Sequence, residues 1–504
     1  MSFNTIDELD RLFNPQRIAI FGASNKIKIG TISLLTILSG NYKGRIYLIH
    51  PRDDSILGIK AYPKLKNVPE QVDLAIISVP AESVPSVMED CAENGVRSAV
   101  IYSANFSEVG EEGKRLEEEV IRIAKRGGIR FVGPNCMGIV NNAINLCALM
   151  NFTIPRKGDV SMVSQSGTLG TINMINASSQ GVGFNKFASS GNEADLKMED
   201  FIEYFAQDED THVIVAFIEG TRSGKRFIDV IENAAENKPF IVLKGGTTTA
   251  GSKAAHSHTG SMAGSDQIYD ALFRQKGVIR ANDEGDMINL IKGFSKSILP
   301  RGKNVAIYTS GGGFGVLTSD ACEKNGLNVA KLSDETINSL NKILPPFWSH
   351  GNPIDITASG GMSMDSSINK NSLEILLSAE EVDAIIFMEF NFDGYMKKVL
   401  PEIQNEDIRN IMAAVLDGGI LDVESETKET IKLKDRYKKP MICVNISGTY
   451  YEGDEILEDG GIPVYQSTSD AARVLSKLLN YNEYLNKKRL IADADKSISS
   501  IIKE

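Results

Sequence analysis

The sequence is poor in the residues that stabilise small secreted proteins and in those that form nucleic-acid-binding surfaces. Its 504 residues include one tryptophan and five cysteines, and 54 lysines and arginines are outnumbered by 66 aspartates and glutamates. The resulting formal net charge of −12 argues against a nucleic-acid-binding surface, which needs a clustered excess of basic residues. An anionic ligand must therefore be held locally, by backbone amides, helix N-termini and a few cations.

The cysteines are also too scattered for a disulfide framework or a zinc site. Their number is odd, and no two of them form a C-x-x-C pair. No metal site is predicted on this basis. The five are Cys91, Cys136, Cys147, Cys322 and Cys443.

Long apolar runs and the common catalytic loops are missing as well. No stretch reaches 18 apolar residues, and the N-terminus MSFNTIDELDRLFNPQ has neither a basic start nor an apolar core, so we expect a cytoplasmic protein. The motifs G-x-x-x-x-G-K-[ST], H-E-x-x-H and G-x-S-x-G do not occur. The chain thus contains no evident ATP-binding loop of its own.

Short apolar runs that alternate with longer amphipathic segments predict an α/β fold with parallel sheets. A length of 504 residues is typical of about three domains. We predict domains at 1–147, 148–299 and 300–485 with a tail at 486–504, and the segment ILPRGKN at 298–304 is the best linker candidate. The apolar runs predicted to contain the strands lie at 17–23, 45–51, 74–80, 98–104, 129–134, 159–167, 212–220, 239–246, 304–313, 382–390, 440–448 and 462–467, and a C-terminal helix is predicted from Ser469.

An internal repeat pairs VSMVSQSGTLG, from residue 160, with VAIYTSGGGFG, from residue 305. Each copy reads as a strand, a Ser/Gly turn and the start of a helix. Such a turn presents free amides and the positive end of a helix dipole, and it can hold a phosphate without a basic patch. Two copies suggest a shared phosphate pocket, although either turn alone could simply connect a strand to a helix.

The first predicted strand leads into the Gly-rich turn GASNKIKIG at 22–30, as in a nucleotide-binding Rossmann unit. The turn is not G-x-G-x-x-G. The second strand ends in His50, Pro51 and Arg52 rather than in the acidic residue that holds a ribose diol. The pattern favours a phosphorylated adenylate, as in CoA or NADP, over a plain structural turn.

The segment KGGTTTAGSKAAHSHTGSMAGSD at 244–266 is the most distinctive part of the chain. It is a long loop of small residues that contains His256 and His258, and loops of this length in compact domains are usually functional. A neutral imidazole is a good nucleophile toward phosphorus near pH 7. Glu219, at the end of a predicted strand, could accept the second imidazole N–H. A surface loop with incidental histidines and a solvated glutamate are the alternatives.

Several motifs occur together in one order: GPNCMGIVN, VSQSGTLG, SSGNEADLKMEDFIEYF, FIEG, SKAAHSHTGSMAGSDQIYDALFRQKGVIR and GNPIDIT. With them the chain resembles the alpha subunit of ADP-forming acyl-CoA synthetases, within the succinyl-CoA synthetase superfamily, from about Leu12 to Leu479. The resemblance implies a Rossmann-type CoA-binding domain followed by two flavodoxin-like domains. It also implies a heterotetramer in which a separate ATP-grasp beta subunit binds ATP or ADP with Mg²⁺.

The resemblance further implies roles for individual residues. His258, rather than His256, would carry the phosphoryl group, and Glu219 would stabilise it. The two phosphate sites would be Ser166, Gly167 and Thr168, and Gly311, Gly312 and Gly313. CoA would lie along Gly22, Ala23, Ser24, Gly30, Pro51, Val79, Pro80, Ser103, Asn135 and Cys136.

The implied reaction converts a carboxylate, CoA and ATP into acyl-CoA, ADP and phosphate through a phosphohistidine and an acyl phosphate. Three positions depart from the family pattern, namely Asn105, His256 and His350, and none of these departures removes a residue that the chemistry requires. The main alternative is a catalytically silent CoA-binding or CoA-sensing paralogue. A protein acetyltransferase would need a further domain for which no residues remain, and an NADP-dependent dehydrogenase is the weakest rival.

Overall fold

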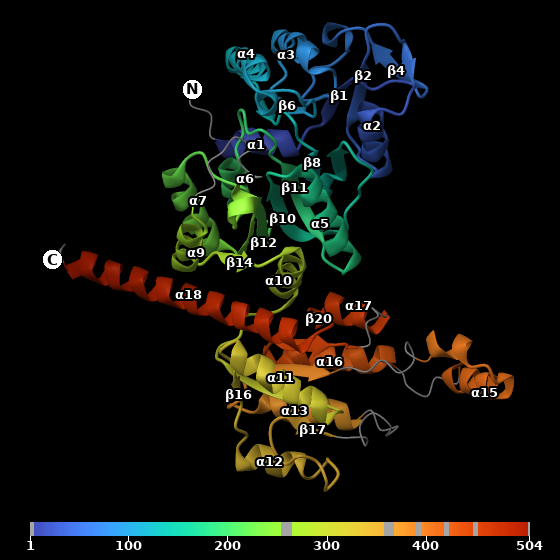
Figure 1. Ribbon diagram of the computed structural model, residues 1–504, viewed down its shortest axis with the longest axis vertical. Helices are drawn as coiled ribbons and strands as arrows, with labels where there is room; N and C mark the ends of the chain where they lie inside the picture. Colours follow the sequence, from blue (N-terminus) through green and yellow to red (C-terminus); the bar gives the residue numbers. More distant parts are fainter. Residues whose placement is uncertain are drawn as a thin grey trace. The chain divides into compact units, whose positions relative to one another are not determined.

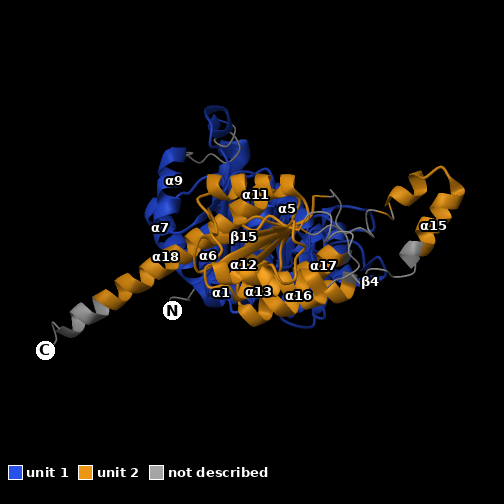
Figure 2. Cartoon of the chain, turned by 90° about the horizontal axis from the view of Figure 1, so that it is seen from below, with its two compact units in different colours: residues 1–291 blue, residues 292–504 orange. Residues whose placement is uncertain are grey.

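The structure is a computed structural model that describes residues 5–253, 265–356, 367–388, 396, 398–417, 423–446 and 452–501. The chain divides into two compact units, residues 1–291 and 292–504 (Figure 2). Each unit is built from mostly parallel strands covered by helices, which confirms the predicted α/β class (Figure 1). None of the helices in the described ranges combines the length and apolarity needed to cross a bilayer.

The first sheet of unit 1 has the strand order β3-β4-β2-β1-β5-β6-β7. All its pairs are parallel except that of β3 with β4. The five strands predicted in this region are confirmed. The bounds are β1 Arg17–Phe21, β2 Arg45–Ile49, β3 Ser55–Ile56, β4 Ile59–Tyr62, β5 Leu74–Ile77, β6 Ser98–Ile101 and β7 Arg130–Val132.

Helices cover this sheet because its central strands are apolar on both faces. Helix α2 (Ile29–Ser39) follows β1, whereas α3 (Val84–Glu93) and α4 (Glu111–Gly127) pack side by side (Figure 1). The core under α3 and α4 includes Ile77, Met88 and Val120, all fully buried. A parallel sheet that is covered in this way leaves its carboxyl edge as the open place for a ligand.

The second sheet of unit 1 has the order β14-β13-β12-β10-β11-β8-β9. Its strands are β8 Gly138–Asn141, β9 Leu146–Leu149, β10 Lys157–Ser164, β11 Phe184–Ser189, β12 Val213–Ile218, β13 Phe240–Lys244 and β14 Ile279–Ala281. Its helices are α5 Gly167–Ser179, α6 Met198–Gln207, α7 Gly224–Asn237 and α9 Asp266–Gln275, and α10 Glu284–Lys296 spans the boundary of the two units. The antiparallel hairpin β8–β9 belongs to this sheet, although the first predicted domain extends to residue 147. The predicted domain limits stay a prediction.

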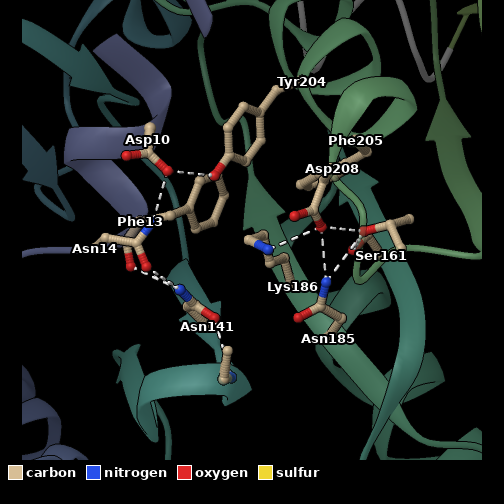
Figure 3. Close-up of polar contacts among 12 residues, drawn as sticks. Asp10, Phe13, Asn14, Asn141, Ser161, Asn185, Lys186, Tyr204, Phe205 and Asp208 are labelled. Carbon is tan, nitrogen blue, oxygen red and sulfur yellow. Dashed lines mark hydrogen bonds and ion pairs between the residues drawn. The ribbon is translucent and has the colours of Figure 1, made fainter. Parts of the chain in front are cut away.

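Strand β11 was not predicted, because its sequence FNKFAS carries polar residues that are buried in the fold. The Lys186 side chain is only 4% exposed, and its Nζ lies 2.8 Å from Asp208 Oδ2 (Figure 3). The same oxygen accepts hydrogen bonds from Asn185 Nδ2, at 2.8 Å, and from the hydroxyl of Thr211. This local neutralisation allows a lysine to occupy a central strand.

The N-terminal helix α1 (Thr5–Phe13) packs on the second sheet through an aromatic cluster. Phe13 stacks on Tyr204 with ring centroids 5.4 Å apart (Figure 3). It also contacts Phe201 and Phe205. Asn141 Nδ2, on β8, donates to the Phe13 carbonyl at 2.9 Å. Helix α1 therefore fastens the start of the chain to both β8 and α6.

Unit 2 contains a third parallel sheet of order β16-β15-β18-β19-β20, with β17 paired to β15. Its strands are β15 Asn304–Thr309, β16 Asn328–Val329, β17 Ile354–Asp355, β18 Ala384–Met388, β19 Met441–Val444 and β20 Val464–Tyr465. Its helices are α11 Gly312–Lys324, α12 Asp334–Leu340, α13 Ser367–Ser378, α15 Glu406–Asp417, α16 Val423–Tyr437, α17 Glu452–Asp459 and α18 Thr468–Ile501. The predicted C-terminal helix is confirmed, and α18 continues through most of the predicted tail.

Replacement of Asp208 by Ala should destabilise unit 1, because it leaves the buried Lys186 ammonium without its counter-charge. The free energy of unfolding is expected to fall by about 3 kcal/mol, measured by urea denaturation followed by circular dichroism. The double variant Lys186→Met/Asp208→Ala removes both charges and should regain part of that loss. A double variant no more stable than the single one would contradict this account.

Candidate functional site

A cavity of about 700 Å³ lies in unit 1, where strands of the first and second sheets end. Its wall is formed by residues that follow β1, β5, β6, β7 and β10. Ligands of open α/β sheets bind at this carboxyl edge. The predicted residues that line the cavity are Gly22, Val79, Pro80, Ser103, Asn135, Cys136, Ser166, Gly167 and Thr168.

Four residues of the predicted CoA set do not line the cavity. Ala23 and Gly30 are buried, Ser24 is half-buried, and Pro51 is exposed. Ser24 holds the turn together, since its amide donates to Thr31 Oγ1 at 3.0 Å. The structure therefore brings together six of the ten predicted positions in one cavity.

Close backbone approach explains the glycines of the first turn. Gly22 has φ +91°, and a Cβ at this position would lie 2.5 Å from the Ser78 carbonyl oxygen. A Cβ at Gly30 would lie 2.7 Å from the Ala23 amide nitrogen. The turn is therefore compact, and its backbone can approach a ligand closely.

Hydrogen bonds to backbone carbonyls hold one wall of the cavity, which is formed by Ser103, Asn135 and Cys136. Ser103 Oγ donates to the Val79 carbonyl at 2.5 Å, and the Asn135 amide donates to the Ser103 carbonyl at 2.9 Å. The Cys136 thiol contacts the Ile101 carbonyl at 3.3 Å. Burial raises the pKa of this thiol to about 12, so Cys136 is a packing residue rather than a nucleophile.

The turn after β10 forms the N-terminus of α5, as the repeat predicted. Ser166 is the N-cap residue, and its side chain accepts a hydrogen bond from the Leu169 amide. A Cβ at Gly167 would lie 2.3 Å from Met137 Cγ and 2.7 Å from Ser189 Oγ. Free amides at a helix start inside a cavity are suited to bind an anion.

The side-chain amide of Gln165 connects this turn to Glu219. Gln165 Oε1 accepts from the backbone amides of Glu219, at 2.6 Å, and of Gly220, at 3.2 Å. Gln165 Nε2 donates to the Gly220 carbonyl at 3.0 Å and to Glu193 Oε1 at 3.1 Å. Glu219 is half-buried at the end of β12, and Lys244 Nζ donates to its carbonyl at 2.8 Å. The role predicted for the Glu219 side chain stays a prediction.

The loop at residues 189–196 contributes cavity residues that were not predicted, namely Gly191, Asn192 and Glu193. It also binds the first sheet, because the Asn192 amide donates to the Pro134 carbonyl at 2.9 Å and the Leu196 amide to the Phe131 carbonyl at 3.2 Å. The SSGNEADL motif contains these three residues and could have indicated a functional loop. It was missed because the strand before it, β11, was not predicted and the loop was therefore not placed at a sheet edge.

Two cations line the cavity among the described residues, Lys28 and Arg222. Arg222 Nη2 donates to the Asn192 carbonyl at 2.6 Å, so its guanidinium is oriented by the same loop. A cavity with few cations is consistent with the acidic composition. An anion would be bound there mainly by amide dipoles.

The second predicted phosphate turn lies in unit 2, at the start of α11. Gly311 is the N-cap residue, and its amide donates to Thr309 Oγ1 at 3.1 Å. A Cβ at Gly311 or Gly313 would meet no atom within 4 Å, whereas one at Gly312 would lie 3.0 Å from Asp355 Oδ2. The predicted strand–turn–helix unit is confirmed. His256 and His258 lie outside the described residues.

Comparison with protein families gives three matches along the chain. Residues 16–142 match a CoA binding domain, residues 157–294 a succinyl-CoA ligase-like flavodoxin domain, and residues 305–431 a ligase-CoA domain. The matches follow the order of the three sheets.

Individual relatives resemble nearly the whole chain. The chain is 38% identical to acetate–CoA ligase [ADP-forming] II subunit alpha of Pyrococcus furiosus, over 92% of this chain and 96% of the relative. It is 35% identical to acetate–CoA ligase [ADP-forming] I of Archaeoglobus fulgidus, over 97% of this chain and 66% of that longer relative. Its fold matches a Ca. Korarchaeum cryptofilum acetyl-coenzyme A synthetase 1 in complex with phosphate and ADP, with a TM-score of 0.81, 33% identity, and coverage of 95% and 98% of the two chains.

Replacement of Gly191 by Ala should disturb the loop at residues 189–196. Gly191 has φ +60°, and a Cβ would lie 2.3 Å from the Pro134 carbonyl oxygen. Gly58 is a matched control, since it has φ +79° and no atom within 4 Å of its Cβ position. Gly58→Ala should cost about 1 kcal/mol of stability through backbone strain alone. Gly191→Ala should lower the thermal unfolding temperature further, and equal effects of the two substitutions would disprove the close contact.

Proposed function

The chain belongs to the family of ADP-forming acetate–CoA ligases, and from this premise we propose that it is the CoA-binding subunit that carries the phosphoryl group during synthesis of an acyl-CoA. The observation that carries the proposal is the shared cavity. Residues predicted to bind CoA, among them Val79 and Ser103, and the predicted phosphate turn at Ser166–Thr168 line the same space. A thiol and an acyl phosphate could therefore meet there.

In the proposed reaction a carboxylate, CoA and ATP give acyl-CoA, ADP and phosphate. His258 takes the phosphoryl group from ATP and passes it to the carboxylate, and the CoA thiol then attacks the acyl phosphate. Glu219 would accept the second imidazole N–H, which fixes the tautomer and stabilises the cationic phosphoimidazole. The turns at Ser166–Thr168 and Gly311–Gly313 would each bind the phosphoryl group through helix N-termini.

We place the ATP site on a partner beta subunit with an ATP-grasp fold. The P. furiosus relative is named as a subunit alpha, and the chain spans about two thirds of the longer A. fulgidus relative. The absence of a phosphate loop of the G-x-x-x-x-G-K-[ST] type from the sequence supports the same division. Mg²⁺ bound with ATP on that subunit would neutralise the phosphate charge, and we propose a heterotetramer of both subunits.

A catalytically silent CoA-binding paralogue is the main rival. It is disfavoured because the residues needed for turnover are all present: the histidine of the SHTG motif, Glu219 and both phosphate turns. In the structure, Gln165 holds the backbone of Glu219 beside the first of these turns. A CoA sensor would have no need for this arrangement.

His258→Ala should abolish phosphorylation of the chain. The native complex with its partner subunit is incubated with γ-labelled ATP, and the wild-type chain should acquire an acid-labile, base-stable label, as expected of a phosphohistidine. His256→Ala is the matched control, because it removes the neighbouring histidine of the same loop and should retain the label. A label that persists in His258→Ala would show that His258 does not carry the phosphoryl group.

CoA should stabilise the chain against thermal unfolding, whereas NADP should not. A ligand that binds only the folded state raises the unfolding temperature by mass action. Gly30→Ala should weaken this effect of CoA, since a Cβ would lie 2.7 Å from the backbone of the first turn. Gly224→Ala is the control, because no atom lies within 4 Å of its Cβ position. A larger shift with NADP than with CoA would favour a dehydrogenase.

A further inference from the structure

A buried carboxyl group, that of Glu193, lines the cavity next to the predicted phosphate turn. Glu193 is 4% exposed and has φ +55°, a conformation uncommon for a residue with a side chain. Its Oε1 accepts hydrogen bonds from Ser190 Oγ, at 2.8 Å, and from Gln165 Nε2, at 3.1 Å. Among the described residues no hydrogen-bond donor reaches its other oxygen, Oε2. Glu193 is therefore oriented through one oxygen and leaves the other for a ligand.

The position of Glu193 is set by the elements on both sides of the cavity. Ser190 follows β11 and Gln165 follows β10, so both donors come from the ends of neighbouring strands. The Glu193 amide donates to the Ser190 carbonyl at 3.3 Å, and this contact closes the turn that carries the side chain. Left-handed backbone at a non-glycine residue costs free energy and is found mostly where the surroundings impose it, often at functional sites.

The other carboxylate of the cavity wall, Glu108, has no oxygen left for a ligand. Its Oε1 accepts from the Asn105 amide at 2.7 Å, and its Oε2 accepts from the Phe106 amide at 3.1 Å and from Asn192 Nδ2 at 2.5 Å. Glu108 therefore stabilises the turn that contains Asn105. Glu193 is the carboxyl of the two that is available for proton transfer.

We propose that Glu193 is the general base that accepts the thiol proton of CoA when the sulfur attacks the acyl phosphate. This inference rests on the proposed function, because it assigns a residue to its last step. A C–S bond forms between the CoA sulfur and the acyl carbon, and the C–O bond to phosphate breaks. The thiol proton moves to Glu193 Oε2, and the phosphate leaves with the electron pair of the broken bond. Glu193 then returns the proton to the departing phosphate.

The surroundings of Glu193 give its carboxyl group a pKa suited to this proton transfer. Burial raises the pKa of Glu193 to about 7, and the negative charge of Glu199 acts in the same direction, whereas the hydrogen bonds from Gln165 and Ser190 and the charge of Arg222 lower it. A thiol has an ordinary pKa of about 8.5. A base whose pKa lies near the working pH is efficient, because a substantial fraction of it is deprotonated and it is still a strong enough proton acceptor.

The decisive variant is Glu193→Gln, which keeps a carbonyl oxygen for Ser190 and Gln165 and replaces only the oxygen that is left for a ligand. The complex with the partner subunit is assayed for two half-reactions, labelling by γ-labelled ATP and thioester formation from acetyl phosphate and CoA. The rate of thioester formation should fall about 100-fold, the usual contribution of a general base. Labelling and the CoA-induced thermal shift should be unchanged, which shows that the variant is folded.

Two further variants and a pH profile separate catalysis from structure. Glu193→Asp retains a carboxyl group and should restore part of the rate. Glu381→Gln is the matched control, since Glu381 is half-buried in unit 2, accepts a hydrogen bond from Thr336 Oγ1 at 2.8 Å, and does not line the cavity. Its thioester rate should be near that of the wild type. The wild-type rate should fall as the pH drops below about 7, because protonated Glu193 cannot act as a base, and Glu193→Gln should lack this dependence.

The outcomes distinguish this inference from the proposed function. A wild-type complex that neither takes the label nor uses acetyl phosphate would overturn the proposed function and the inference with it. A wild-type complex active in both half-reactions, beside a Glu193→Gln variant with full thioester formation, would overturn the inference alone. Loss of labelling in a folded Glu193→Gln variant would also overturn it, because Glu193 would then act on the phosphohistidine.

Discussion

The loop at residues 189–196 is the constraint on which the cavity depends. It leaves the second sheet at β11 and pairs through backbone amides with Phe131, Gly133 and Pro134 at the end of the first sheet. The Asp195 carboxylate adds a hydrogen bond from the Phe131 amide at 2.9 Å. Because one short loop binds the edges of both sheets, the residues predicted to bind CoA and the phosphate turn at the start of α5 face one cavity. Without these contacts each sheet edge would present only half of the site.

Gln165 connects the phosphate turn and the 189–196 loop to the residues that follow β12, Glu219 and Gly220. Its side-chain oxygen accepts from the Glu219 and Gly220 amides, and its side-chain nitrogen donates to Glu193 and to the Gly220 carbonyl. An amide that uses both its oxygen and its nitrogen in this way can adopt only one orientation, since a flip would place like groups together. The carboxyl group of Glu193 and the backbone of Glu219 are therefore held by one side chain that performs no chemistry itself. Hydrogen bonds from supporting side chains to functional residues commonly determine how well a site is preorganised.

The apolar hairpin β8–β9 was not predicted. The sequence was sufficient for most of the apolar parallel strands, the two strand–turn–helix units and the family, which the comparisons confirm. Each of these depends on a local pattern: a run of Val and Ile, a Ser/Gly turn, or an ordered set of motifs. Strand β11 was missed because the polar Lys186 and Asn185 are buried there beside Asp208, whose distant contribution no local pattern reveals. The cavity role of Glu193 was missed for the same reason. Its burial arises from Gln165 and Ser190 on neighbouring strands, and neighbours in space are not neighbours in sequence.

A chain with a net charge of −12 repels anionic ligands such as phosphate and CoA at long range, so the cavity must attract them through local groups. Few cations line it, so we expect anions to be bound mainly by the free amides at the start of α5, whose dipoles are fixed by the fold. A permanently ionised carboxylate beside these amides would repel the phosphate. Burial raises the pKa of Glu193 to about 7, so near neutral pH the residue is partly protonated and imposes less of this repulsion. The same desolvation that makes Glu193 a suitable base thus keeps the cavity open to its anionic ligands.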